Sequence, residues 1–142
     1  MPNYFMVVQT HYNWSLTKER NFTFIGFKDG QSRNIIRSIE IGDLLIYYVS
    51  SGISSLGAIV EVTSPLYKDS DLYWDDFYNL RFKTKPIVIL QEEQFVPFRP
   101  LVERLNFVKN KRRWANYVYH CIRILNESDF KLMQSAILQA KK

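Results

Sequence analysis

The sequence predicts an α+β fold, a mixed β-barrel of about five or six short strands with short helices packed outside it. Strand-like segments rich in aromatic and β-branched residues alternate with short helical segments, and the order is not that of regular βαβ units. Turn residues are spread along the chain without a linker. The 142 residues are 46% hydrophobic, enough for one core, so we expect a single domain over residues 1–142.

Strands are expected where apolar, β-branched and aromatic residues cluster between turn residues. The turn-prone run Ser50–Ser55 separates two such clusters, which predicts a hairpin opened by Gly42 and Asp43. The strand segments are 4–9, 44–50, 56–63, 78–82 and 87–90, and 118–125 is read as a further strand.

Helices are expected to be few and short. Asn13 is the predicted cap of a helix over 14–20, and residues 32–39 and 100–105 are two further candidates. The strongest signal is 127–138, where Asn126 is a good N-cap. Asp129 stands three residues later, in the position of a capping-box acid.

Composition limits the class of protein and its partners. No apolar run approaches the roughly 18 residues of a membrane span, and the N-terminus lacks the pattern of a signal peptide. One cysteine, Cys121, allows no internal disulfide. We therefore expect an intracellular, cytoplasmic location, or a nuclear one in a eukaryote, and no membrane partner. The net charge of +5 favours a polyanionic partner without requiring one.

Enzyme motifs are absent. The chain has no phosphate-binding glycine loop, dinucleotide fingerprint, nucleophile elbow or zinc-protease motif. His120 and Cys121 are adjacent, so on a strand they point to opposite faces and cannot act as a catalytic pair. His11 is a better candidate, because it follows the first strand. The acidic run 69–76 lacks the glycine and final glutamate of a calcium loop, so we expect no metal. Because the enzyme motifs are missing, we also expect no enzyme and no cofactor.

The most informative basic segment is 104–114. Four of the five residues 109–113 are cationic, and aromatic residues stand on both sides. Proteins use this arrangement to neutralise phosphates while a base stacks nearby. A solvated loop with a buried Trp114 explains the composition equally well. A second polar and basic cluster consists of Lys28, Arg33, Asn34 and Arg37.

Taken together, these segments resemble the EVE domain family, small PUA-like barrels related to YTH domains. The likeness covers nearly the whole chain, and its last segment is the most specific. The motifs are Asn13-Trp14 after the first strand, an expected turn at Ile25-Gly26-Phe27 followed by Arg33-Asn34, and the segments 42–49, 57–62 and 107–114.

The resemblance implies a binding module that accepts a modified nucleobase of DNA or RNA, with a basic surface for the backbone. Related sequences commonly carry Trp at the position of Ile25, so an aromatic wall is missing here, and Phe24, Phe27 or Trp14 is the expected substitute. The implied pocket residues are Thr10, Asn13, Trp14, Phe24, Ile25, Phe27, Asn34, Asn110 and Trp114. The implied phosphate-binding residues are Arg33, Lys109, Lys111, Arg112 and Arg113.

Three functions from different classes remain open. The first is recognition of a modified base, the second is nucleic-acid binding without base selectivity, and the third is a small-molecule sensor or enzyme that uses the same pocket. For Trp14, a role in the core is as compatible with the sequence as a role in the pocket. The sequence does not specify the modified base, DNA or RNA, or the oligomeric state.

Overall fold

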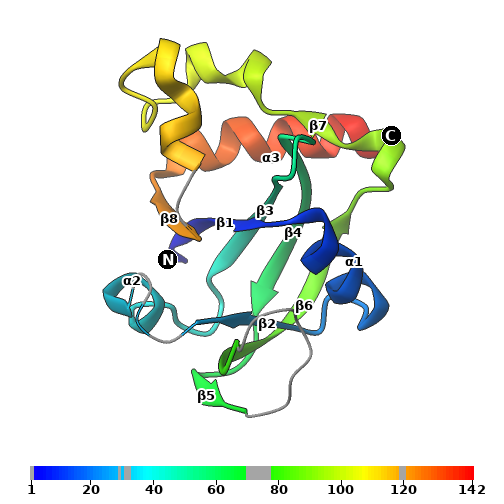
Figure 1. The fold of residues 1–142 in the computed structure, drawn as a ribbon, viewed down its shortest axis with the longest axis vertical. Helices are drawn as coiled ribbons and strands as arrows, with labels where there is room; N and C mark the ends of the chain where they lie inside the picture. Colours follow the sequence, from blue (N-terminus) through cyan, green and yellow to red (C-terminus); the bar gives the residue numbers. More distant parts are fainter. Residues whose placement is uncertain (1, 29, 31–32, 70–77, 119–120) are drawn as a thin grey trace.

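One curled mixed sheet organises the chain in the computed structural model, which describes residues 2–28, 30, 33–69, 78–118 and 121–142 (Figure 1). Six strands follow the order β2-β6-β4-β3-β1-β8, while the two-residue strands β5 and β7 pair with β6 and β4. The strands of the described residues are β1 (Tyr4–Gln9), β2 (Phe24–Phe27), β3 (Leu44–Val49), β4 (Ser55–Val62), β5 (Tyr67–Lys68), β6 (Leu80–Ile89), β7 (Val96–Pro97) and β8 (Ile122–Leu125). The predicted α+β class with a mixed sheet is confirmed.

The central strands form as the apolar pattern predicts. β1 runs parallel to β3 and antiparallel to β8, and every other pairing is antiparallel. The predicted hairpin is confirmed as β3 and β4, which pair with a register shift between Tyr47 and Tyr48. Parallel strands need a long connection, and here α1, β2 and α2 lie between β1 and β3.

Two sequence predictions in this sheet are wrong. Residues 78–82 and 87–90 were expected as separate strands, but β6 runs unbroken from Leu80 to Ile89. Proline has no N–H to donate to a ladder, and the register between β4 and β6 shifts where Val60 faces Pro86. This irregularity accommodates the proline in the ladder, so the strand continues past it. The expected turn at 25–27 is instead part of strand β2, which pairs with β6.

The helices are α1 (His11–Glu19), α2 (Arg33–Arg37) and α3 (Glu127–Lys141), with 3-10 helices η1 (Glu92–Gln94), η2 (Arg99–Arg104) and η3 (Lys111–Val118). Helix α1 starts three residues before the predicted one. The hydroxyl of Thr10 accepts the N–H of Asn13 at 3.1 Å, so Thr10 is the cap and Asn13 lies inside the helix. The cap of α3 is confirmed, because the Asn126 side chain accepts the N–H of Asp129 at 2.7 Å.

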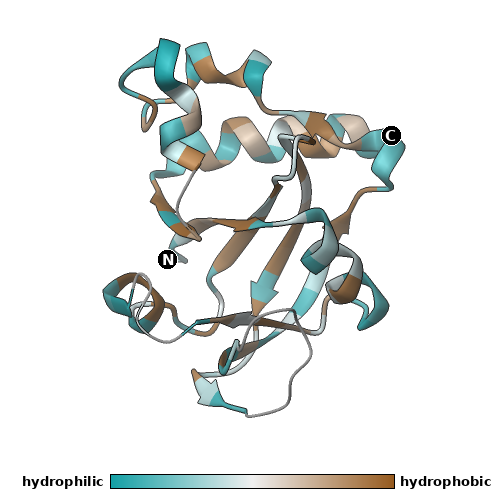
Figure 2. Cartoon of the chain, viewed as in Figure 1, coloured by the Kyte–Doolittle hydropathy of each residue, from teal (hydrophilic) through white to brown (hydrophobic). Residues whose placement is uncertain are grey.

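Most strands of the sheet are coloured as hydrophobic in Figure 2, and their buried side chains form two hydrophobic cores. Along β1, Phe5 and Val7 join a core with α1, α2 and β2, while Met6 joins a second core beneath α3. This alternation follows from the two-residue period of a strand. In α3, Phe130, Met133 and Ile137 are all buried in the second core. No helix in the described ranges is both long enough and apolar enough to cross a bilayer.

Candidate functional site

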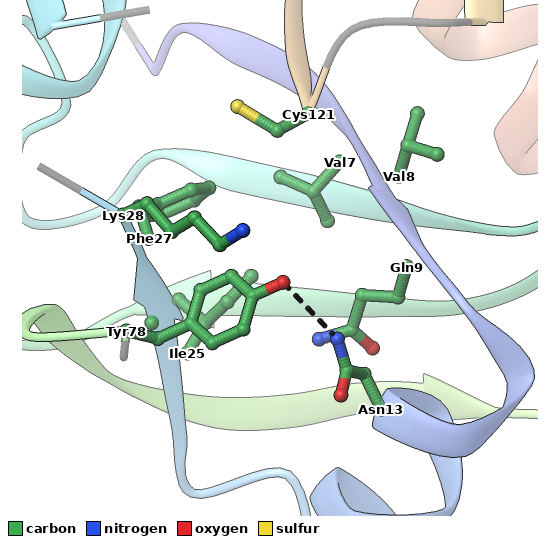
Figure 3. Close-up of a pocket in the computed structure, with 10 residues that line it drawn as sticks. Val7, Val8, Gln9, Asn13, Ile25, Phe27, Lys28, Tyr78 and Cys121 are labelled. Atoms are coloured by element: carbon green, nitrogen blue, oxygen red, sulfur yellow. Dashed lines mark hydrogen bonds between the residues drawn. The ribbon is translucent and has the colours of Figure 1, made fainter. Parts of the chain in front are cut away.

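A small cavity opens between β1, β2 and the start of α1, on the sheet face opposite α3 (Figure 3). Its volume is about 50 Å³. Ile25 and Phe27 of β2 and Val7 of β1 form an apolar floor. Gly26 lies between the two β2 side chains, so the backbone itself forms part of the wall. The cavity is therefore built by the strand that the sequence analysis had interpreted as a turn.

Two side-chain amides supply its polar groups. Gln9 ends β1 and Asn13 lies in the first turn of α1, and they are 9% and 7% exposed. Gln9 Nε2 donates to Thr17 Oγ1 at 3.3 Å, and Asn13 Nδ2 donates to Tyr78 Oη at 3.4 Å. The oxygens Gln9 Oε1 and Asn13 Oδ1 are buried and accept no hydrogen bond from the residues that the structure describes. A buried acceptor without a donor costs about 1–3 kcal/mol, so these oxygens favour a ligand that carries N–H groups.

Tyr78 and Lys28 form the remaining wall. The Lys28 ammonium lies 5.6 Å from the centroid of the Tyr78 ring. Behind them, the Arg81 guanidinium is 2% exposed, and its Nε donates to the Tyr78 carbonyl oxygen at 3.1 Å. Arg81 also pairs with Asp69 at 3.3 Å, so this buried arginine fixes the backbone that carries the tyrosine. The cavity thus has an aromatic ring and a cation side by side.

Cys121 also lines the cavity and is half-buried. His120 and residues 70–76 of the acidic run 69–76 lie outside the described residues. His11 is the first residue of α1, and its Nε2 lies 2.6 Å from Glu92 Oε1 at the surface. It does not line the cavity. Among the residues that the structure describes, no three His, Cys, Asp or Glu side chains gather as a metal site would require.

The structure brings together only part of the expected pocket. Asn13, Ile25 and Phe27 line the cavity. Thr10 is exposed and caps α1. Phe24 points elsewhere, with its ring 5.4 Å from the Arg81 guanidinium carbon. Arg33 and Asn34 are exposed on α2 and do not line the cavity.

Trp14 lies in the core rather than at the cavity, which corrects its expected placement. Its side chain is 1% exposed and contacts three aromatic rings, with centroids 4.9 Å from Phe22, 5.0 Å from Phe95 and 6.0 Å from Tyr47. At 1% exposure the indole is not accessible to a ligand. The reason is helical geometry, because Asn13 and its neighbour Trp14 are about 100° apart around α1 and point in different directions.

The basic segment 109–113 lies on the α3 side of the sheet. Trp114 packs 5.8 Å from Phe98 in the second core and does not line the cavity. Asn110 organises the start of η3, because its N–H donates to Tyr117 Oη at 3.1 Å. Lys109, Arg112 and Arg113 are exposed. Lys111 differs, since its ammonium donates to the carbonyl oxygens of Val102 and Leu105 at 3.0 and 2.6 Å.

Three cavity residues were not predicted from the sequence, namely Gln9, Tyr78 and Cys121. Lys28 was expected only as part of a basic cluster. Gln9 carried a signal, because a polar residue at the inward position of an apolar strand needs a reason to be buried. Nothing local marks Tyr78. It reaches the cavity through the pairing of β6 with β2, a contact between segments more than 50 residues apart.

Comparisons with known proteins agree with this architecture. Two UPF0310 proteins, from Pyrococcus abyssi and Pyrococcus horikoshii, are 28% and 29% identical to the chain over 95% of it and 99% of their own length. The structure of human THYN1 in complex with 5-methylcytosine-containing DNA superposes with a TM-score of 0.65 at 13% identity, covering 99% of this chain and 98% of that one.

A YTH domain is similar to the same extent. The domain of the Zygosaccharomyces rouxii MRB1 protein, solved in complex with N6-methyladenosine RNA, gives a TM-score of 0.65 at 16% identity over 99% of this chain and 87% of that one. The fold is therefore that of PUA-like and YTH domains, as the resemblance implied. A model of the EVE domain matches residues 3–136, nearly the full length, and the chain belongs to the EVE domain family.

Proposed function

We propose that the chain binds a modified nucleobase of DNA or RNA in the cavity between β1, β2 and α1, and that it binds this ligand without converting it. The observation that carries the proposal is the pair of buried, unpartnered oxygens of Gln9 and Asn13. Support also comes from the EVE family match and from two structural neighbours of this chain, which were solved with methylated DNA and with methylated RNA. Nucleobases carry the N–H groups that these two oxygens require.

The forces available suit a base edge. Gln9 and Asn13 accept N–H groups, Ile25 and Phe27 contact apolar substituents, and Tyr78 provides a ring face. Stacking on such a ring contributes about 1–3 kcal/mol. An engineered cavity of about 150 Å³ admits benzene, so a cavity of about 50 Å³ accepts the substituted edge of a base while the ring rests at its opening. A modification on that edge then changes the affinity directly.

A second candidate, nucleic-acid binding without base selectivity, is favoured by the position of the cations. Lys109, Arg112 and Arg113 are exposed near Trp114, on the sheet face opposite the cavity. A backbone bound there makes phosphate contacts without a base reaching Gln9 or Asn13. The two candidates differ in one measurable property, which is whether affinity depends on the modification.

The experiment titrates short oligonucleotides that differ in a single base by fluorescence anisotropy. The probes carry cytosine or 5-methylcytosine in DNA, and adenine or N6-methyladenine in RNA. We expect tighter binding to one modified probe than to its plain counterpart. Asn13→Ala should remove that preference, whereas Asn34→Ala, an exposed asparagine away from the cavity, should retain it.

Three results contradict the proposal. Equal affinity for modified and plain probes leaves the unselective candidate, and no affinity for any probe excludes both candidates. Recovery of a chemically altered probe, detected by mass spectrometry after incubation, shows turnover and refutes the claim that the chain only binds. Thermal unfolding of each variant confirms that a loss of binding is not a loss of fold.

A further inference from the structure

A second and larger hollow lies on the other side of the sheet from the cavity. It is an open groove of about 640 Å³ between η2 and η3, against about 50 Å³ for the cavity. In Figure 1 these two 3-10 helices lie in the upper part of the view, in yellow-green and yellow, while β2 lies in the lower half. In its lining, Val102 belongs to the second core and Trp114 packs against it, whereas Ile25 and Phe27 of the cavity belong to the first core. A ligand in the groove is therefore not the base held in the cavity.

An aromatic ring and two aliphatic side chains form the apolar part of this groove. Trp114 lines it together with Pro100 and Val102. The indole packs against Phe98, with ring centroids 5.8 Å apart, and it is only half-buried, unlike the indole of Trp14 in the core. A ring that is held on one side and lines an open groove offers a stacking surface to another planar ring.

Exposed cations stand at the groove and beside it. Arg99 of η2 and Arg112 of η3 line it, and Lys109 and Arg113 are exposed next to it in the chain. None of these four cations forms an ion pair with a residue that the structure describes. Lys111 also lines the groove, but its ammonium already binds two carbonyl oxygens. A stacking ring flanked by available cations suits a strand in which bases and phosphates alternate.

One carboxylate lines the same groove. Glu103 lies on η2, is exposed, and forms no ion pair within the described ranges. An acidic peptide would bring its own carboxylates against Glu103, whereas a base with an exocyclic amine offers it an N–H. Glu103 therefore favours a nucleobase over an acidic side chain as the ligand of the groove, and among the bases it favours those that carry an amino group.

We propose that the groove between η2 and η3 binds a segment of single-stranded nucleic acid. An amino-bearing base stacks on Trp114 and donates to Glu103, and the phosphates on either side of it lie at Arg99 and Arg112. A paired base is held inside a duplex and presents neither its ring face nor its amine in this way, so the ligand is a single strand. No modification of the base is required. The inference goes beyond the proposed function, because it assigns a second site on the opposite face that does not depend on the cavity.

The test compares two short, fluorescein-labelled strands of equal length, oligo-deoxycytidine and oligo-deoxyuridine. Cytosine carries an exocyclic amine where uracil has a carbonyl oxygen, and the single N–H of the uracil edge lies between two carbonyl oxygens that repel a carboxylate. Fluorescence anisotropy measures the affinity at several salt concentrations. Binding at the groove is followed separately by the indole N–H signal of Trp114 in a nitrogen–proton NMR spectrum, assigned by its loss in Trp114→Leu.

We expect oligo-deoxycytidine to shift the Trp114 signal and to bind about threefold to tenfold more tightly than oligo-deoxyuridine, the range for one hydrogen bond. Glu103→Gln should abolish this preference, because an amide accepts from an amine and also donates to a carbonyl oxygen. Trp114→Leu should weaken the binding of both probes about tenfold through the loss of stacking.

The two arginines are tested through the salt dependence. Arg99→Ala and Arg112→Ala should each lower the slope of log affinity against log salt by about 0.7, the contribution of one phosphate of a single strand. Lys83→Ala is the matched control, because Lys83 is an exposed cation on β6 that does not line the groove, and it should leave the slope unchanged.

Three results overturn the inference. The first is a Trp114 signal that moves with neither probe, and the second is equal affinity for the two probes. The third is a larger shift of this signal with polyglutamate than with the oligonucleotides, which would make an acidic protein segment the ligand. In each of these cases, a preference for a modified base that Asn13→Ala removes leaves the proposed function intact.

The opposite outcome is equally distinct. A groove that behaves as expected, in a chain with no preference for any modified base, supports this inference and contradicts the proposed function. Thermal unfolding of each variant separates a loss of binding from a loss of fold. Glu103→Gln and Arg99→Ala change exposed side chains, so they decide the question even if Trp114→Leu unfolds the chain.

Discussion

The ammonium of Lys111 donates a hydrogen bond to the carbonyl oxygen of Leu105 at 2.6 Å, and a second one to that of Val102 at 3.0 Å. Val102 lies within η2 and Leu105 follows its last residue. Lys111, the first residue of η3, therefore caps the C-terminal end of η2. A residue expected to bind phosphate has a structural role that its charge makes possible.

We expect Lys111→Ala to destabilise the chain by about 1.5–3 kcal/mol, because two carbonyl groups lose a charged donor. Urea unfolding followed by Trp fluorescence measures the change, and the midpoint should fall without a change in slope. Arg112→Ala serves as the control, since Arg112 is exposed in the same helix. Equal stability of the two variants would show that the hydrogen bonds of Lys111 contribute nothing.

The three exposed cations of this segment give a separate prediction. Replacing Lys109, Arg112 and Arg113 together by Ala should weaken oligonucleotide binding and reduce its salt dependence, because fewer counterions are released. For a single strand the slope of log affinity against log salt should fall by about 0.7 for each phosphate that the variant no longer neutralises. An unchanged slope would mean that the segment does not touch the backbone.

The sequence predicted β1 and the cap of α3, both of which depend on local pattern. Residues 4–9 have the composition of a strand, and Asn126 offers a side-chain oxygen to the first turn of α3, as the structure has it. The residues that share the cavity were not predictable in this way. Tyr78 and Gln9 meet only because β6 pairs with β2 and α1 folds back over β1. Their proximity is set by the sheet, not by spacing along the chain.

Asp129 illustrates how a local pattern identifies the residue but not its partners. It was expected to complete a capping box at α3, and its N–H does donate to Asn126. Its carboxylate, however, accepts the backbone N–H groups of Asn106 and Phe107 at 2.7 and 2.9 Å. It is fully buried, so these two donors are what permit the charge there.

We expect Asp129→Asn to lower the free energy of unfolding by about 1.5–3 kcal/mol, since an amide has one acceptor oxygen for two backbone donors. The amides of Asn106 and Phe107 should also exchange faster with deuterium, because both donate to the carboxylate that the substitution removes. Ser128→Ala, one residue away and exposed, is the control. An unchanged exchange rate at Asn106 and Phe107 would contradict this role of the carboxylate.

Trp14 gives a prediction about the core. Trp14→Ala should cost about 3–5 kcal/mol, the range for a buried aromatic residue. Gly57→Ala should also destabilise the chain, by about 1–3 kcal/mol, because its new Cβ would lie 2.8 Å from Trp14 Cη2 and 3.0 Å from Phe95 Cε1. Thermal unfolding measures both effects. A melting temperature unchanged in Trp14→Ala would show that the indole is not a core residue.

Tyr47 gives the last prediction, which concerns pH. Its hydroxyl is buried and has no hydrogen-bond partner in the described part of the chain, and burial raises the pKa of Tyr47 well above its ordinary value of 10.0. The folded state therefore disfavours the phenolate. Below pH 10 both states hold the proton and no stability is lost. As the pH rises above 10, the unfolded state releases the proton more readily, so the free energy of unfolding falls.

Tyr47→Phe should remove much of this alkaline loss and, at neutral pH, raise stability by about 1 kcal/mol, because an unpaired buried hydroxyl disappears. Tyr48, whose pKa burial also raises, should retain a smaller loss in the variant. Urea unfolding of both proteins from about pH 7 to pH 11, a range that spans the ordinary tyrosine pKa, measures the difference. If the stability curves of the two proteins stay parallel across that range, the pKa of Tyr47 does not differ between the folded and the unfolded state, and the prediction is wrong.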